Sequence, residues 1–154
     1  KSDAIYTSNS NISCAVMTAD CIPILVTNIS GSIIGCIHAG WRGLKLNIIQ
    51  NFFGSIQEDN VNFKVLIGPC ISKRRYEVDD KVFREFPNYK KFFSKNKYGK
   101  YNMDIRSIAC DILSQLGITD VTISPSCTYE DRRFYSYRRN KITGRFISAI
   151  WFNR

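Results

Sequence analysis

The chain has 154 residues, 44% of them hydrophobic and 13% aromatic, a composition that predicts one folded domain and excludes a disordered chain. No apolar run approaches the ~18 residues of a membrane-spanning helix, and nothing resembles a secretion signal. The six cysteines are scattered along the chain, which argues against the disulfide framework of a small secreted domain and predicts a reducing, cytoplasmic location.

The formal net charge of +9 indicates either an anionic partner or an ordinary basic surface, and we favour the second. Basic residues cluster at 73–75, 90–100 and 132–145. In the last cluster arginines alternate with aromatic residues, as they do in proteins that bind single-stranded nucleic acid. No recognisable RNA- or DNA-binding motif accompanies them, so the sequence does not predict a nucleic-acid partner.

Apolar patterns predict strands and helices that interleave along the chain. The predicted strands cover 3–7, 12–18, 22–27, 33–37, 63–67, 118–124 and 146–152. The predicted helices cover 44–57, 79–86, 89–94 and 102–116, the last beginning at Asn102 and ending at Gly117. A capping box of Thr128 and Asp131 predicts a further short helix over 134–139. We therefore prefer a structural role to a catalytic one for Glu130 and Asp131. A tight hairpin favours an α+β layered domain with a mixed, largely antiparallel sheet and flanking helices.

The segment 18–43 holds the hairpin and the only histidine, His38. If the turn centres on Ile29 and Ser30, Cys21 faces His38 across the two strands, with Cβ atoms roughly 4.5–5.5 Å apart. A thiolate and an imidazole at this separation can share a zinc ion through bonds of about 2.3 and 2.0 Å. The prediction depends on register, because a one-residue slip would send the two side chains to opposite faces.

Three further positions are candidates for a role in the site. Gly40 to Gly43 precedes a helix, and Arg42 is predicted to bind phosphate or ribose there, although an exposed arginine beside a turn fits equally well. Asp20 either orients a ligand or a substrate amine, or caps a turn. Cys70 and Cys127 are candidate pocket-lining thiols, and a nucleophilic role for either would require it to share the histidine.

Seven motifs occur in order along the chain: ADC at 19–21, HAGWRG at 38–43, IGPCIS at 67–72, YEV at 76–78, CTYED at 127–131, FYSYRR at 134–139 and TGR at 143–145. Together they resemble the laccase-domain family, named for polyphenol oxidase activity, and the match runs from Asp3 to the last strand. The resemblance implies an α+β fold shared with deamidase toxins. It also implies the activity now ascribed to the family, which is zinc-dependent purine nucleoside phosphorolysis with adenosine deamination.

The resemblance implies one zinc ion held by one cysteine and two histidines, of which Cys21 and His38 are the matching residues here. The remaining family histidine precedes the first residue of this sequence. We therefore expect 1–154 to be a single catalytic domain that lacks an N-terminal segment and the third zinc ligand; the alternative is a natural variant of the family with an incomplete site.

The leading hypothesis is an enzyme in which phosphate attacks the ribose anomeric carbon of adenosine or inosine, with zinc-bound hydroxide available for deamination. Catalytic roles are assigned to Asp20 and Arg42, and substrate contacts to Arg42, Cys127 and Arg145. A multicopper centre is excluded, because it needs many imidazoles. The alternatives are a Cys–His thiol hydrolase or amidase and a non-catalytic basic binding module. The oligomeric state is not predicted.

Overall fold

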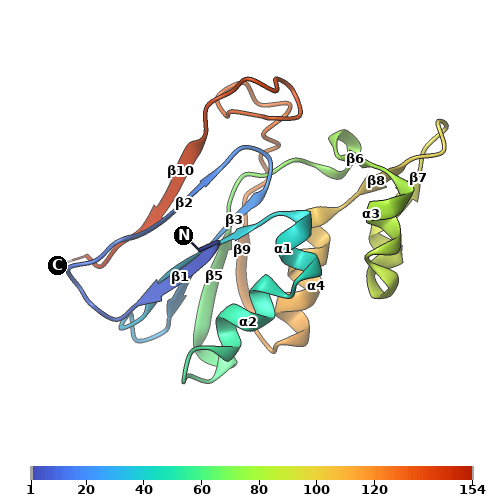
Figure 1. Cartoon of the computed structure of the whole chain (residues 1–154). Coiled ribbons are helices and arrows are strands. Elements are labelled where there is room, and N and C mark those ends of the chain that lie inside the picture. The colour runs from blue at the N-terminus through green and yellow to red at the C-terminus, as the bar shows by residue number, and fades with distance from the viewer. Residues whose placement is uncertain (1, 154) are drawn as a thin grey trace.

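A five-stranded sheet forms the centre of the molecule (Figure 1). The computed structural model describes residues 2–153. In sheet order, the strands are β1 (Ala4–Thr7), β4 (Ile34–Ala39), β3 (Ile22–Asn28), β5 (Phe63–Ile67) and β9 (Asp120–Ile123). Neighbouring strands are antiparallel except β5 and β9, which are parallel. The prediction of an α+β domain with a mixed, largely antiparallel sheet is therefore confirmed.

Three helices lie together on one side of this sheet (Figure 1): α1 (Trp41–Lys45), α2 (Ile48–Gly54) and α4 (Ile105–Gln115). The core forms between them and the strands. Its fully buried members include Ile22 and Ile37 from the sheet and Ile108 and Ile112 from α4, and Phe53 of α2 is almost fully buried. Each such side chain contributes about 1.5–3 kcal/mol through burial, so this layer dominates the stability of the fold.

Two smaller sheets extend the central one. Strands β2 (Cys14–Thr18) and β10 (Phe146–Ile150) pair antiparallel, which brings the end of the chain beside the segment that precedes Cys21. Strands β6 (Glu77–Val78), β8 (Tyr101–Met103) and β7 (Phe93–Lys95) form the other sheet, beside α3 (Asp80–Arg84). The short 3-10 helices are η1 (Asn60–Asn62), η2 (Lys73–Arg75) and η3 (Pro87–Phe92).

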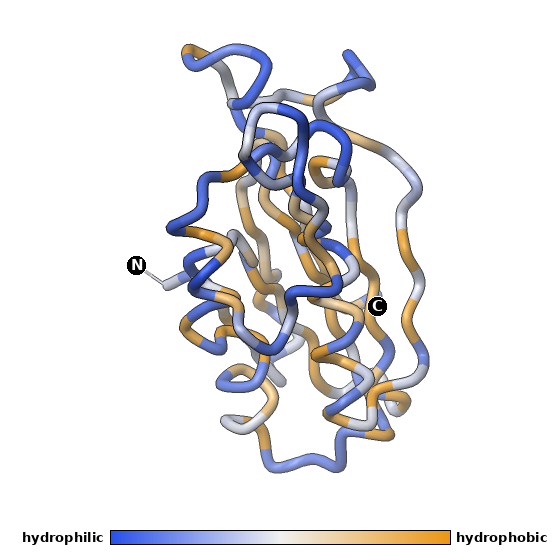
Figure 2. Tube along the Cα trace, turned by 90° about the vertical axis from the view of Figure 1, so that its right-hand side faces the viewer, coloured by the Kyte–Doolittle hydropathy of each residue, from blue (hydrophilic) through white to orange (hydrophobic). Residues whose placement is uncertain are grey.

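Hydrophobic residues concentrate in the strands and helices of the interior, and hydrophilic residues in the surrounding loops (Figure 2). All six cysteines are free, and Cys14 and Cys36 are buried. Among residues 2–153, no helix has both the length and the apolar character needed to cross a membrane.

The hairpin between β3 and β4 differs in register from the prediction. The structure pairs Pro23 with His38, so the predicted pairing of Cys21 with His38 is wrong by two residues. The turn centres one residue later, because Gly31 takes the positive φ of 68° and the Asn28 side chain accepts hydrogen bonds from the loop. Since side chains alternate along a strand, a shift of two leaves Cys21 and His38 on the same face.

The predicted helix over 44–57 is wrong, because it is divided into α1 and α2. Asn47 takes a left-handed conformation with φ 58°, which a continuous helix excludes. Asn102 does not begin the later helix, since Asp104 caps α4 by accepting a hydrogen bond from the Ser107 amide. Gly117 ends this helix region with φ 80°, as predicted.

Two other predicted helices are also absent. The segment 89–94 divides between η3 and β7, because Phe93 packs as a strand residue against Phe83 and Phe86. The segment 134–139 forms bends and turns. The Thr128 amide, which a capping box would direct to Asp131, donates to the Cys70 carbonyl, and the Asp131 carboxylate accepts from the Arg133 amide. The proposed capping box of Thr128 and Asp131 is therefore wrong.

Candidate functional site

Cys21 and His38 meet at the edge of the hairpin. Cys21 immediately precedes β3, and His38 is the penultimate residue of β4. A Cβ atom placed on Gly40 would lie 2.9 Å from Sγ of Cys21 and 4.0 Å from Nε2 of His38. The thiol and the imidazole therefore converge on the space that the missing side chain of Gly40 leaves open.

Asp3 orients the imidazole ring of His38. Its Oδ1 lies 3.1 Å from Nδ1 of His38, and its backbone carbonyl accepts the His38 amide hydrogen at 2.7 Å. Pairing of β1 with β4 places Asp3 opposite His38. A carboxylate on Nδ1 fixes the ring orientation and leaves Nε2, which lies 4.0 Å from the Cβ position of Gly40, as the nitrogen available to a metal ion.

Two cavities adjoin this pair of side chains. One, of about 200 Å³, is here called the Tyr137 cavity; its lining residues are Met17, Thr18, Ala19, Cys21, His38, Tyr137 and Arg145. The other, of about 210 Å³, is the Trp41 cavity; its lining residues are Asp3, Cys21, His38, Gly40, Trp41, Arg42 and Gly43. Cys21 and His38 belong to both, so they sit where the two spaces meet.

Burial raises the pKa of Cys21 to about 11, and the negative charges of Asp20 and Asp3 add to the increase, whereas Arg145 lowers it. The free thiol is therefore protonated at neutral pH. A divalent cation would reverse this state, because metal binding displaces the thiol proton.

The structure brings Arg42 and Arg145 to opposite cavities around the same pair of residues. The Arg42 guanidinium lies 4.3 Å from the centre of the Trp41 ring, a cation–π contact that leaves its nitrogens available to an anion. Arg145 donates to the carbonyls of Thr143 and Gly144 at 3.1 and 2.9 Å. Both predicted site arginines thus line the cavities that contain Cys21 and His38.

Asp20 lies next to this site but lines neither cavity. Its carboxylate, 7% exposed, accepts hydrogen bonds from the Thr128 hydroxyl at 2.7 Å and from the Arg138 amide at 2.6 Å. Its backbone carbonyl accepts the Ile71 amide hydrogen. Asp20 therefore ties the loop over 126–139 to the strand that carries Cys21.

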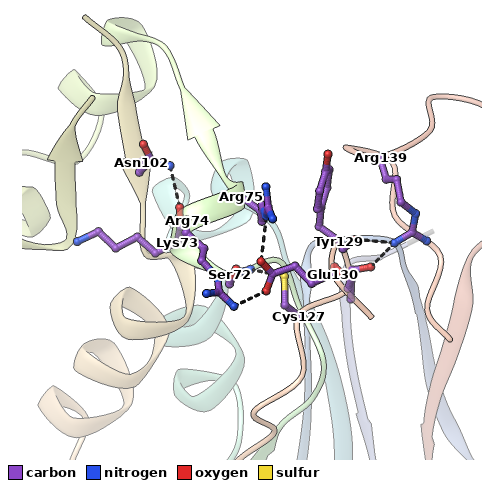
Figure 3. Close-up of polar contacts among 10 residues, drawn as sticks. Ser72, Lys73, Arg74, Arg75, Asn102, Cys127, Tyr129, Glu130 and Arg139 are labelled. Carbon is purple, nitrogen blue, oxygen red and sulfur yellow. Dashed lines mark hydrogen bonds and ion pairs between the residues drawn. The ribbon is translucent and has the colours of Figure 1, made fainter. Parts of the chain in front are cut away.

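Cys127 lines neither cavity. Its sulfur accepts a hydrogen bond from the Ser72 amide at 3.3 Å (Figure 3), and its backbone forms an isolated bridge with Cys70. Nearby, Glu130 is held by Arg74 and Arg75 at 2.7 and 2.9 Å (Figure 3). The structural interpretation of Glu130 is consistent with this geometry.

Among the lining residues that are not sequence candidates, three carry polar side chains: Asp3, Thr18 and Tyr137. No local signal identifies Asp3, because its contact with His38 requires the pairing of β1 with β4, 35 residues apart. The FYSYRR motif contains Tyr137, and the ADC motif directly follows Thr18, so proximity to these motifs was the available signal. The Thr18 hydroxyl is buried and has no hydrogen-bond partner among the described residues.

The donor atoms at this site suit a zinc ion. A thiolate and an imidazole with a carboxylate behind it are common zinc ligands, and Gly40 keeps the space between them open. Among residues 2–153, no group of three His, Cys, Asp or Glu side chains could hold a metal ion. Cys21 and His38 are thus two candidate ligands, whereas a catalytic zinc site ordinarily uses three.

The Gly40→Ala variant tests whether this open space matters. Gly40 has φ −84° and ψ 172°, which any residue adopts, so the expected effect comes only from the added methyl group. Contact at 2.9 Å must displace Sγ of Cys21, and we expect zinc affinity to fall about tenfold or more with little change in stability. Gly54→Ala is the matched control, because nothing lies within 4 Å of its added Cβ. Equal zinc affinity in both variants, measured by competition with a chromogenic chelator, would contradict this geometry.

Comparison with known proteins identifies the family. A model of the family described as multi-copper polyphenol oxidoreductase laccase matches residues 1–153. The chain belongs to this laccase family. Its single histidine cannot build the multicopper centre that the family's description suggests.

Curated members of the laccase family are similar to the whole chain. Purine nucleoside phosphorylase YfiH of Escherichia coli K12 is 36% identical over 155 residues, with 98% of this chain and 64% of that protein covered. Purine nucleoside phosphorylase of Haemophilus influenzae is 36% identical over 159 residues, with 99% and 65% covered. The chain thus spans a little under two thirds of the length of these relatives.

Solved structures show the same fold. The crystal structure of NMB0706 from Neisseria meningitidis superposes with a TM-score of 0.94 at 36% identity and covers 99% of this chain and 65% of that one. YlmD from Geobacillus stearothermophilus gives a TM-score of 0.88 at 27% identity, with 99% and 61% covered.

Proposed function

We propose that this protein is a zinc-dependent purine nucleoside phosphorylase, acting on adenosine or inosine with phosphate, and that adenosine deamination is a second activity. The observation that carries the proposal is the convergence of Cys21, His38 and Arg42 on one cavity. The names of the curated relatives support the same reaction class. The free cysteines suit the cytoplasmic location predicted from the sequence, and kinship with the deamidase-toxin fold stays a prediction.

In this proposal Cys21 and His38 hold zinc, with a third ligand from a histidine outside these 154 residues. Zinc when bound supplies a Lewis acid. Asp3 keeps the ring of His38 in the orientation that presents Nε2. Cys21 binds as the thiolate, and its high pKa means that metal binding at neutral pH releases one proton.

Arg42 is proposed to bind the attacking phosphate. Its guanidinium is an exposed fork at the rim of the Trp41 cavity, and a fork of this kind matches two phosphate oxygens. Contact with the Trp41 ring limits the positions that the guanidinium adopts, so less freedom is lost when phosphate binds.

The Tyr137 cavity is proposed to receive the nucleoside. Tyr137 supplies an aromatic ring to the cavity wall, and Lys141 and Arg145 lie over this ring at 4.2 and 5.8 Å from its centre, so a purine would contact the ring together with these cations. The buried Thr18 hydroxyl has no partner among the described residues, and a substrate hydroxyl or ring nitrogen would satisfy it. Asp20, in this proposal, positions the loop that carries Tyr137 and does not contact the substrate.

One observation favours the alternative of a thiol hydrolase or amidase, because Asp3, His38 and Cys21 follow one another as the carboxylate, imidazole and thiol of such enzymes do. The raised pKa of Cys21 opposes it, since a nucleophilic thiol needs a lowered pKa. We therefore favour the metal-dependent activity.

The experiment is an assay of base release from adenosine and inosine by the chain, with zinc and with imidazole to replace the third ligand. The E. coli relative serves as the positive control. We expect base release to require phosphate, to stop when a chelator removes zinc and to return when zinc is restored.

Three outcomes would contradict the proposal. Base release without phosphate would indicate hydrolysis. Amide hydrolysis that survives chelation but stops on thiol alkylation would indicate the Cys–His alternative. No turnover by the chain, together with steeply salt-dependent binding of single-stranded nucleic acid, would indicate a basic binding module.

A further inference from the structure

A groove of about 740 Å³ lies between η2, β7 and the beginning of α4. It shares no lining residue with the Tyr137 or Trp41 cavity. Its lining includes Ser72, Lys73 and Arg74 near η2, Ser94 from β7, and Asp104 and Arg106 at the first turn of α4; we call it the Lys73 groove. A volume of this size falls within the range of about 300–1,000 Å³ that small-molecule sites occupy.

The Lys73 groove contains positive charge that the chain leaves uncompensated. Lys73 is half-buried, and its ammonium has no acidic partner among the described residues. Figure 3 shows its side chain pointing away from Glu130, whose carboxylate is already shared by Arg74 and Arg75. Partial burial removes water from a cation, so an unpaired one favours an anionic ligand.

The other charged residues of the groove do not neutralise the positive charge of Lys73. Arg106 is half-buried and donates to the Ser126 carbonyl at 2.8 Å and to the Cys70 sulfur at 3.4 Å, neither of which is an anion. Asp104 is the one carboxylate of the lining, and it accepts the Ser107 amide hydrogen as the cap of α4. The groove therefore keeps its excess positive charge on the η2 side, whereas on the α4 side the cation Arg106 and the carboxylate Asp104 offset each other in net charge.

Neutral donors lie among these cations and are held in place. The Ser72 hydroxyl oxygen is buried without a hydrogen-bond partner among the described residues. The Ser72 amide donates to Cys127, and Asn102 donates to the Lys73 carbonyl at 3.1 Å (Figure 3). These contacts fix the turn on which Ser72 and Lys73 sit, so little ordering is needed when a ligand binds.

We propose that the Lys73 groove binds a small molecule that carries two phosphoryl groups, as a diphosphate does. Lys73 and Arg106 approach from separate elements, so two anionic groups match them better than one. Arginine, lysine and hydroxyl donors are the groups that proteins use for phosphoryl oxygens. This site is separate from the phosphate position proposed at Arg42.

Inorganic pyrophosphate is the probe, titrated calorimetrically into the folded chain at physiological ionic strength. We expect Lys73→Ala to weaken binding about tenfold or more, the effect of losing one charge-assisted hydrogen bond. Ser94→Glu should do the same, because it places a carboxylate in the groove. Ser94 is exposed, so this variant is expected to fold normally.

Two neighbours provide matched controls. Arg75 binds the same Glu130 as Arg74 and lies outside the groove lining, so Arg75→Ala should change affinity by less than about twofold. Lys95 follows Ser94 in β7 and also lies outside the lining. Lys95→Glu alters the net charge more than Ser94→Glu does, yet should weaken binding less.

Several results would overturn the proposal. Absence of pyrophosphate binding by the unaltered chain would do so directly. If the loss of pyrophosphate affinity instead followed the change in net charge and were greatest for Lys95→Glu, it would indicate non-specific electrostatic attraction or a site for a nucleic-acid strand that extends over β7. Loss on Arg42→Ala, with Lys73→Ala unaffected, would place the binding at the Trp41 cavity.

Discussion

Replacement of Cys21 or His38 by alanine is expected to remove bound zinc and to lower phosphorolysis at least about a thousandfold. Each side chain supplies one of the two ligand atoms that the described residues offer, so its loss leaves a single ligand, too few for a zinc site. The fold should persist, because His38 is partly exposed and Cys21 lies before β3, outside the packed core. Zinc per chain, measured by mass spectrometry, and thermal unfolding would test both parts.

Two further variants provide reference points for the loss of zinc: a control that should retain zinc and a variant that should bind it more weakly. Cys110→Ala removes another partly buried thiol on α4, away from both cavities, and should retain zinc. Asp3→Ala removes only the carboxylate behind His38, and we expect zinc affinity to fall about 10–100-fold. Full zinc content and activity in Cys21→Ala or His38→Ala would contradict the assignment of the site.

The hairpin shows how a sequence can predict a site while its pairing register is mistaken. The turn was placed at Ile29 and Ser30, but Gly31, with φ 68°, moves its centre by one residue. Glycine adopts positive φ without steric cost, so the signal was present in the sequence. The alternation of side chains keeps Cys21 and His38 on one face despite the slip, and their role as zinc ligands stays a prediction.

The walls of the site could not be predicted from local patterns: Arg145 is a candidate through the family resemblance, and Tyr137 is not a candidate at all. Tyr137 and Arg145 reach Cys21 only because β10 pairs with β2 and the loop before it folds across. Pairings over such distances depend on the packing of the whole core, which local patterns do not specify. The break between α1 and α2 at Asn47 could not be predicted for a different reason: the helical spacing of apolar residues continues through it.

Asp20→Asn is expected to lower the free energy of unfolding by about 2–4 kcal/mol, the cost of breaking buried hydrogen bonds to a charged group. The two carboxylate oxygens accept separate hydrogen bonds, from Thr128 and from the Arg138 amide. An asparagine side chain has only one acceptor oxygen; if the Arg138 amide keeps it, the Thr128 hydroxyl must turn to accept from the new NH2 group, and both hydrogen bonds lose the charge that strengthens them. Asparagine tolerates the positive φ of 95° at this position, so backbone strain should not contribute to the change in the free energy of unfolding.

Thr128→Val is the graded control, since it removes one donor with similar shape and should cost about 1–2 kcal/mol in urea unfolding. Loss of Asp20 should also loosen the loop over 126–139, so substrate KM should rise because Tyr137 is no longer held beside Cys21. A direct catalytic role predicts the opposite pattern, in which kcat falls while stability and KM stay unchanged. The positioning role of Asp20 predicts a change in stability and KM, and the catalytic role predicts a change in kcat. We expect the first pattern, because both carboxylate oxygens of Asp20 are bound to the protein and can affect the substrate only through the loop that they hold.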